Sequence, residues 1–294
     1  MPNRIRRSIV DTPLGQIHVR VAGVGQSIVL LHWTPGSGRQ YVHLMPELAA
    51  RGYQAIAPDH MGFGFSDARP NAWGVADYAQ SIADVMAALN VSRAAVVGGH
   101  FSSEVAVELA LRHTSRVSAL VLDGSPVWSA EMRAKVLANA RPEPPRWSDS
   151  GDHIAWIWQR ALWLRKMWDP TFTLTDSTSE ILKTAVMENL LAGDTSDTSD
   201  ALKNYDLDLA LPRLSLPVLA LTAETDPLTN CHADVLRLVP GARGHAFKGA
   251  HPLHDGARAA DYARVVHAFL SGSAPDLFHA AAPATNATDA GYRG

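Results

Sequence analysis

The segment AAVVGGHFSSEVAVELALRH, residues 94–113, carries the clearest local signal of the fold class. It begins with a short apolar run that ends in two glycines, which is typical of a strand buried on both faces. From Ser102 onward, apolar residues recur at the three- and four-residue spacing of an amphipathic helix. His100 lies in the tight turn between these two elements. The stretch therefore predicts a buried strand, a sharp turn that displays His100, and a helix.

Strand-like and helix-like segments alternate along most of the chain. Apolar runs at SIVLLH, QAIAP, RAAVVGG, VSALVLDG, LPVLALTAETDP and GHAF predict strands, and amphipathic segments between them predict helices. Two further runs around the turn DTPLG predict an antiparallel hairpin at one edge. Alternation of this kind predicts an α/β fold with a mostly parallel sheet, helices on both faces, and ligands at the carboxyl ends of the strands.

Composition divides the chain into three parts. Residues 1–125 and 212–271 carry the alternating pattern and predict one core domain. Residues 126–211 contain helix-like pieces and most of the tryptophans, so they predict a helical lid inserted into the core. Residues 272–294 are rich in alanine, proline, threonine and glycine, which predicts a disordered tail.

Charge and composition restrict the classes of partner. The chain has 294 residues, 47% apolar and 19% charged, with a formal net charge of −3. This balance argues against nucleic acid or an anionic membrane as a partner. The tryptophan-rich segment 126–211 favours a small-molecule substrate, and a homo-oligomer remains open. No apolar run approaches the roughly 18 residues of a membrane span. The N-terminus lacks the apolar region of a signal peptide. The single cysteine, Cys231, excludes an internal disulfide and favours a reducing compartment, so we expect a cytoplasmic protein.

Several strand-end motifs occur in a characteristic order. They read LLHWTPGSGRQY, APDHMGFGFSD, VVGGHFSSEVAVELA, LVLDGSP, LTAETDP and GAHPLHD. In this order and spacing the chain resembles the α/β-hydrolase superfamily over about residues 15–270. The resemblance implies a strained turn after the fifth strand that presents a nucleophile. Here the nucleophile position holds His100, and Ser102 stands where a second small residue is usual. A frame shifted to Ser102 would place His100 and Glu104 where close backbone approach requires small residues, so neither Ser102 nor Ser103 is expected to attack.

The resemblance also implies a general base and an acid that orients it. His251 matches the position of the base, in the loop after the last strand. Asp226 matches the acid that holds this base in the right tautomer. Asp123, at the end of the sixth strand, is the alternative acid. We therefore expect an Asp226–His251 pair that faces His100.

Backbone amides are expected to stabilise a developing oxyanion. By resemblance these would be the amides of Phe101 and of Trp33 or Thr34, although Trp33 replaces the usual glycine. His32 belongs to the same motif and is either a hydrogen-bonded structural histidine or a residue of the substrate pocket.

Trp156 and Trp163 lie seven residues apart, hence on one helix face, and are either core residues or pocket residues. A metal site formed by His32, His100, His251 and His254 is disfavoured, because no tight ligand spacing occurs. We expect no metal and no cofactor.

Three functions remain open. The first is a cofactor-independent hydrolase for a small apolar or aromatic ester or lactone, in which His251 activates water or His100 attacks. The second is a lyase, decarboxylase, isomerase or cyclase on the same scaffold, and the missing serine favours it. The third is a non-catalytic ligand-binding protein, against which the retention of both Asp226 and His251 argues.

Overall fold

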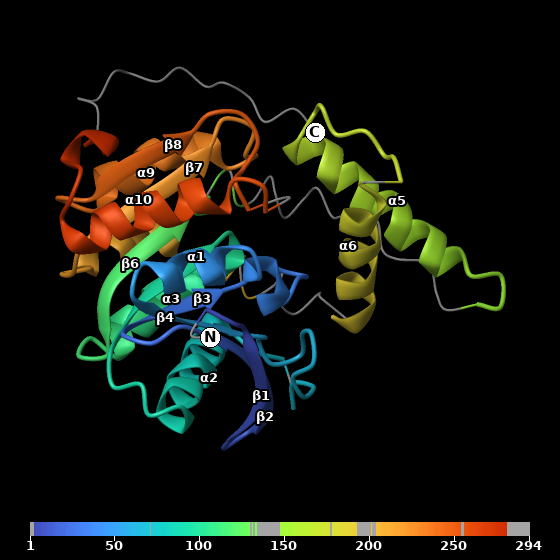
Figure 1. Ribbon diagram of the computed structural model, residues 1–294, viewed down its shortest axis with the longest axis horizontal. Coiled ribbons are helices and arrows are strands. Elements are labelled where there is room, and N and C mark those ends of the chain that lie inside the picture. Colours follow the sequence, from blue (N-terminus) through green and yellow to red (C-terminus); the bar gives the residue numbers. More distant parts are fainter. Residues whose placement is uncertain are drawn as a thin grey trace.

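The computed structural model of this protein describes residues 3–70, 72–129, 131, 133, 148–176, 178–192, 201, 204–253 and 256–280. Its centre is an eight-stranded sheet in the order β1-β2-β4-β3-β5-β6-β7-β8 (Figure 1). The first two strands pair antiparallel, β2 joins β4 antiparallel, and every later pairing is parallel. The expected edge hairpin and mostly parallel sheet are confirmed. The strands are β1 Arg6–Thr12, β2 Gly15–Ala22, β3 Gln26–Leu31, β4 Tyr53–Pro58, β5 Ala94–Gly99, β6 Val117–Asp123, β7 Val218–Ala223 and β8 Arg243–Phe247.

Helices cover both faces of the sheet because the central strands are apolar on both sides. In β3, for example, Val29 and Leu31 pack toward α2 and α3, whereas Ile28 and Leu30 pack toward α1 and α10. Each face therefore has its own apolar core. The helices of the core domain are α1 Leu44–Ala50, α2 Val75–Ala88, α3 Phe101–Arg112, α9 His232–Leu238 and α10 Ala259–Ser271.

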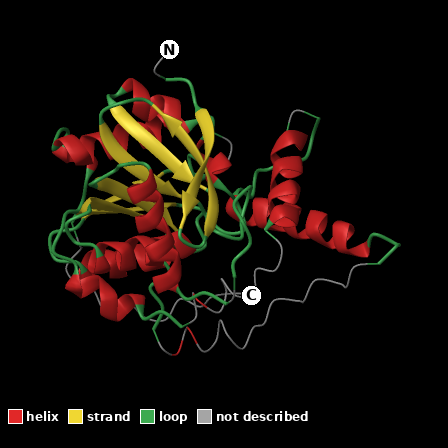
Figure 2. Ribbon diagram, turned by 90° about the horizontal axis from the view of Figure 1, so that it is seen from below, coloured by secondary structure: helices red, strands yellow, loops and turns green. Residues whose placement is uncertain are grey.

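Further helices lie in the segment expected to form a lid. Here α5 and α6 stand out to one side of the sheet, as both views show (Figures 1 and 2). Within the described residues, no helix is both long and apolar enough to cross a bilayer. The described helices of this segment are α5 Asp152–Trp168, α6 Ser179–Leu191 and the short α8 Leu207–Ala210. Short 3-10 helices occur along the whole chain: η1 Gly38–Tyr41, η2 Leu211–Arg213, η3 Thr229–Cys231 and η4 Pro275–Leu277.

The C-terminal segment departs from the expected tail at its start. After α10, η4 is followed by His279, which forms an antiparallel bridge with Gly244 of β8. The amide of His279 donates to the Gly244 carbonyl at 2.9 Å. The prediction of disorder from residue 272 is therefore wrong up to His279, because a bridge of backbone atoms leaves no mark in side-chain composition. Residues 281–294 lie outside the described part of the chain.

Candidate active site

The β5–α3 turn presents His100 at the carboxyl end of the sheet. His100 has φ 51° and ψ −125°, a conformation that costs energy for a non-glycine residue and is typical of functional turns. Its amide donates to the carbonyl of Asp123 at 2.9 Å, which ties the turn to the end of β6. A Cβ on Gly99 would lie 1.8 Å from Trp33 Nε1, so only glycine fits before His100.

His100 forms a close pair with Asp226, which follows β7. His100 Nε2 lies 3.0 Å from Asp226 Oδ2, and the side chains are 18% and 1% exposed. Burial lowers the pKa of His100, but the charge and hydrogen bond of Asp226 outweigh it and raise this pKa above its usual 6.5. When Nε2 carries the proton, the Nε2–H group donates to the Asp226 carboxylate, so Nδ1 is the nitrogen left to meet a ligand.

Asp226 is held in its charged form. Burial alone would raise the pKa of this carboxyl, but the charge and hydrogen bond of His100 and the Leu228 amide lower it below 3.8. That amide donates to Asp226 Oδ1 at 2.7 Å, while Oδ2 accepts from His100. The carboxylate is therefore fixed on both oxygens and can orient the imidazole.

His251 belongs to a different network. Its Nε2 lies 3.0 Å from both carboxylate oxygens of Asp123, and Tyr262 Oη donates to Asp123 Oδ2 at 2.9 Å. The amide of Leu253 donates to His251 Nδ1 at 3.2 Å, so both ring nitrogens are engaged. The side chains of His251 and Asp123 are 0% and 1% exposed.

The expected Asp226–His251 pair is thus corrected. His251 takes the alternative acid Asp123, and Asp226 takes His100. The indole of Trp33 packs against both imidazoles, with ring centroids 4.6 Å from His100 and 4.9 Å from His251. Each imidazole therefore packs on the Trp33 indole, whereas the sequence predicted that His251, paired with Asp226, would face His100.

A second indole reaches His100 from α5. The ring of Trp168 lies 5.5 Å from the His100 ring and 5.4 Å from that of Trp33. Thr225 Oγ1 donates to the Trp168 carbonyl, which fixes the end of α5 beside Asp226. Trp168 is not among the residues that the strand-end motifs predict for this site. Its position just before the helix-ending Asp169–Pro170 was the one available signal.

One of the expected oxyanion donors is already engaged. The amide of Trp33 donates to Gln40 Oε1 at 2.9 Å, so it cannot serve an oxyanion without losing that bond. The amide of Phe101 lies in the first turn of α3, where helix amides have no intrahelical acceptor. Phe101 and Thr34 therefore remain as candidates, and Trp33 does not.

Comparison with known proteins identifies the family. A family model described as the alpha/beta hydrolase fold matches residues 26–254. The chain belongs to the α/β-hydrolase fold family. Haloalkane dehalogenase 2 of Mycobacterium tuberculosis is 28% identical over 138 residues, which are 46% of this chain and 48% of that protein. The 2-hydroxymuconate semialdehyde hydrolase of a Pseudomonas species is 38% identical over 111 residues, 35% of this chain and 38% of that protein. The matches thus span about half of these relatives or less.

Solved structures resemble nearly the whole chain. The enol-lactonase from Burkholderia xenovorans LB400 superposes with a TM-score of 0.70 at 18% identity, covering 90% of this chain and 100% of that one. An esterase from Exiguobacterium antarcticum gives a TM-score of 0.66 at 18% identity, covering 91% and 98%. At this level of identity the likeness establishes the α/β-hydrolase fold alone.

Two residues that the sequence marked as candidates have structural roles in this α/β-hydrolase fold. His32 is fully buried; its Nδ1 donates to the Trp33 carbonyl at 3.0 Å and its Nε2 accepts from the His60 amide at 2.9 Å. Burial lowers the pKa of His32 to about 4, so the ring is neutral. Ser102 Oγ donates to the His32 carbonyl at 2.5 Å and accepts from His60 Nε2 at 2.9 Å. His32 therefore joins two loops and does not line a pocket, and Ser102 is not placed to attack.

The expected pocket tryptophans of α5 lie elsewhere. Trp163 is 61% exposed, and the guanidinium of Arg160 lies 5.4 Å from the centroid of the Trp156 ring. Of the α5 indoles, the one in contact with His100 is that of Trp168. The assignment of Trp163 to a pocket is corrected by its exposure, and Trp156 makes a cation–π contact within its own helix.

Within the described residues, no group of three or more His, Cys, Asp or Glu side chains is arranged to hold a metal ion. His254, one of the four histidines of the disfavoured metal site, lies outside the described residues.

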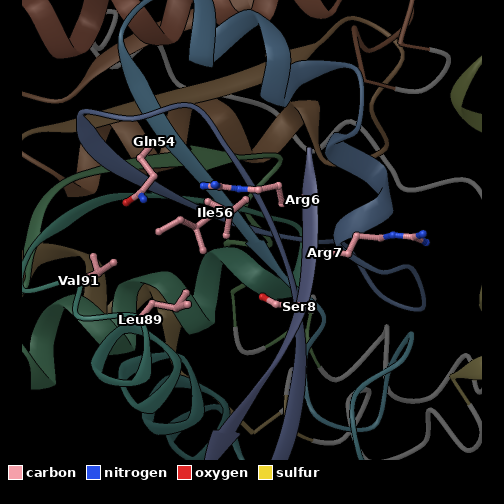
Figure 3. Close-up of a pocket in the computed structure, with 8 residues that line it drawn as sticks. Arg6, Arg7, Ser8, Gln54, Ile56, Leu89 and Val91 are labelled. Carbon is pink, nitrogen blue, oxygen red and sulfur yellow. The ribbon is translucent and has the colours of Figure 1, made fainter. Parts of the chain in front are cut away.

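A hollow of about 360 Å³, lined by residues including Arg6, Gln54 and Val91, lies beside the β1–β2 hairpin and shares no residue with the His100 site (Figure 3).

Gly124 lies directly beside the hydrogen bond between His100 and Asp226. It has φ +61°, and a Cβ there would lie 3.0 Å from both Asp226 Oδ2 and His100 Nε2. We expect Gly124→Ala to lower the free energy of unfolding by about 1–3 kcal/mol, through backbone strain and displacement of the pair. Urea denaturation measures this loss. The matched control is Gly249→Ala, because Gly249 has φ +68° but open space around its Cβ position. Equal losses in the two variants would mean that strain alone acts and that Gly124 does not position the pair.

Proposed function

We propose that this chain is a cofactor-independent hydrolase of small apolar or aromatic esters or lactones, in which His100 replaces the usual serine and acts as general base. The supporting observation is the 3.0 Å contact between His100 Nε2 and Asp226 Oδ2, with Nδ1 left to face a ligand. A carboxylate that fixes the tautomer and stabilises the cation is what a histidine base requires. In this proposal Asp226 orients His100, and His251 is a structural residue.

The proposed reaction consumes one water molecule. His100 Nδ1 takes a proton from water as the water oxygen bonds to the carbonyl carbon. The negative charge that develops on the carbonyl oxygen is stabilised by the amides of Phe101 and Thr34. The imidazolium then returns its proton to the departing alkoxide as the carbon–oxygen bond breaks. The products are an acid and an alcohol, or one hydroxy acid from a lactone, and His100 is neutral again.

The surroundings of His100 favour a small apolar substrate. Trp33 and Trp168 supply two aromatic walls, and Asp226 is shielded from solvent. Pockets for small organic molecules are lined mainly by apolar side chains with a few polar groups that fix orientation. We further propose that residues 126–211 act as a cap, since Trp168 at the end of α5 already packs on His100.

A second candidate uses the same base on carbon. His100 carries an imidazole where an attacking hydroxyl is usual, and such a base can equally remove a proton next to a carbonyl. A lyase, decarboxylase, isomerase or cyclase would result. Non-catalytic ligand binding is the third candidate. The buried carboxylate of Asp226, which accepts a hydrogen bond at each oxygen, argues against it, because binding alone does not require a polarised imidazole.

Isotope labelling distinguishes the candidates. We expect the protein to hydrolyse activated aryl esters or small lactones and, in ¹⁸O-labelled water under single turnover, to place the label in the product acid. Mass spectrometry of the product measures the label. Replacing His100 by Ala should remove this activity, and a fluorophosphonate probe should leave the protein unlabelled. Turnover that instead exchanges carbon-bound hydrogen for deuterium without ¹⁸O uptake would support the second candidate. Labelling of Ser102 by the probe would refute the role of His100.

A further inference from the structure

The sheet has one covered edge and one bare edge among the described residues. At the β8 edge, His279 bridges Gly244 through hydrogen bonds between backbone atoms. At the other edge, β1 pairs only with β2, so its outer side offers unpaired backbone groups. The strand is mostly exposed, and Ile9 at its centre is 50% exposed. Such an edge is a template for pairing with another strand.

The sequence of β1 is complementary to itself. Arg7, Ile9 and Asp11 lie on one face of the strand, because side chains alternate. If a second copy of β1 runs antiparallel with Ile9 opposite Ile9, Arg7 of each copy lies opposite Asp11 of the other. In this register every residue of β1, from Arg6 to Thr12, has a partner in the second copy. The two-fold axis produces two such Arg7–Asp11 pairs. Directly opposed pairs of this kind stabilise a sheet.

Arg7 has no anionic partner among the residues that the structure describes. Its cross-strand neighbour on β2 is Arg20, another cation, whose guanidinium is bound to Asp59 at 2.6 Å. Among the described residues Arg7 makes no ion pair. Asp11 accepts at Oδ1 from the neutral amide of Gln16 at 2.9 Å, which leaves Oδ2 to accept from a cation. A second copy would therefore supply the carboxylate that Arg7 lacks.

From this complementarity we infer that two copies of the chain associate through β1, antiparallel about Ile9, to form one continuous sheet across the dimer. Figure 3 shows Arg6 and Arg7 leaving β1 in opposite directions, so only Arg7 shares the face of Ile9 and Asp11. The contact of two short strands is small compared with stable dimer interfaces. The dimer is therefore weak and forms only as the concentration rises.

Analytical ultracentrifugation with charge-swapped variants tests the dimer. Sedimentation velocity from about 1 to about 500 µM should show a monomer–dimer equilibrium in this range. Arg7→Asp and Asp11→Arg each place like charges opposite one another, so each should weaken association at least about tenfold. The double variant R7D/D11R restores opposite charges and should restore association. Arg4→Asp, which changes the net charge equally just before β1, should leave association unchanged.

Several outcomes would overturn the inference. They are a protein that stays monomeric across the range, single variants that associate like the natural protein, and a double variant that does not recover. Association that appears only after removal of residues 281–294 would assign this edge to the chain's own C-terminal segment instead. Circular dichroism melting of each variant shows that the fold is retained, and the measurement needs no enzymatic activity.

Discussion

Replacing Asp226 by Asn is expected to lower kcat/KM for ester or lactone hydrolysis by roughly 10²- to 10⁴-fold, because a neutral amide no longer stabilises the His100 cation. The pH profile should shift as well. In the proposed reaction, the activity of the natural protein should rise with pH as His100 loses its proton, because Asp226 raises the pKa of His100 above its usual 6.5. Without the charge of Asp226, burial dominates and lowers the pKa of His100. In the plot of kcat/KM against pH, the ascending part should therefore move to lower pH, while the maximal value of kcat/KM falls.

The matched control for Asp226→Asn is Glu224→Gln in the same loop. Glu224 is exposed and accepts from the Gly249 amide at 2.7 Å, so its replacement changes the same chemical group away from His100. We expect kinetics close to those of the natural protein. If the Asp226→Asn variant had the same kcat/KM as the natural protein and the same dependence of kcat/KM on pH, Asp226 would not act through His100.

Replacing His251 by Ala is expected to lower the free energy of unfolding by about 3–5 kcal/mol, because Asp123 would remain buried without its main partner. Among the described side chains, the carboxylate would keep only the hydroxyl of Tyr262. Urea denaturation measures the loss. The fraction that remains folded should still hydrolyse substrate, since both ring nitrogens of His251 are engaged inside the protein.

Tyr262→Phe provides a graded comparison for His251→Ala. It removes one hydrogen bond to Asp123 and keeps the imidazole, so the expected loss is about 1–2 kcal/mol. A His251→Ala protein as stable as the natural one but devoid of hydrolysis would contradict this reading. His251 would then be the catalytic base, and His100 would not.

The architecture could be predicted because the signals that specify it are local. The apolar run of β5, the glycines before His100 and the amphipathic pattern of α3 are each readable within a few residues. Strands that are apolar on both faces require helices on both faces, which follows from burial alone. The bridge at His279 escaped prediction because it uses backbone atoms, which every residue carries.

The positions of the candidate site residues could also be predicted, but their pairing could not. The order of the strand-end motifs predicts that four residues lie at the carboxyl ends of the strands: His100, Asp123, Asp226 and His251. Asp123 ends β6, and Asp226 lies three residues after the neighbouring strand β7, so either carboxylate lies within reach of an imidazole in that region. The choice between them depends on ring orientation, which no spacing along the chain encodes.

The α/β-hydrolase fold, the turn that displays His100, and the set of acids and imidazoles at the carboxyl ends of the strands can be read from the chain alone. They depend on burial and backbone conformation, which a few neighbouring residues specify. The partners of these residues are visible only in three dimensions: Asp226 holds His100, Asp123 and Tyr262 hold His251, and Trp168 reaches the turn from α5. These contacts join segments far apart in the chain, as does the Trp33 indole, which packs over Gly99 and against both imidazoles, so no local pattern specifies them.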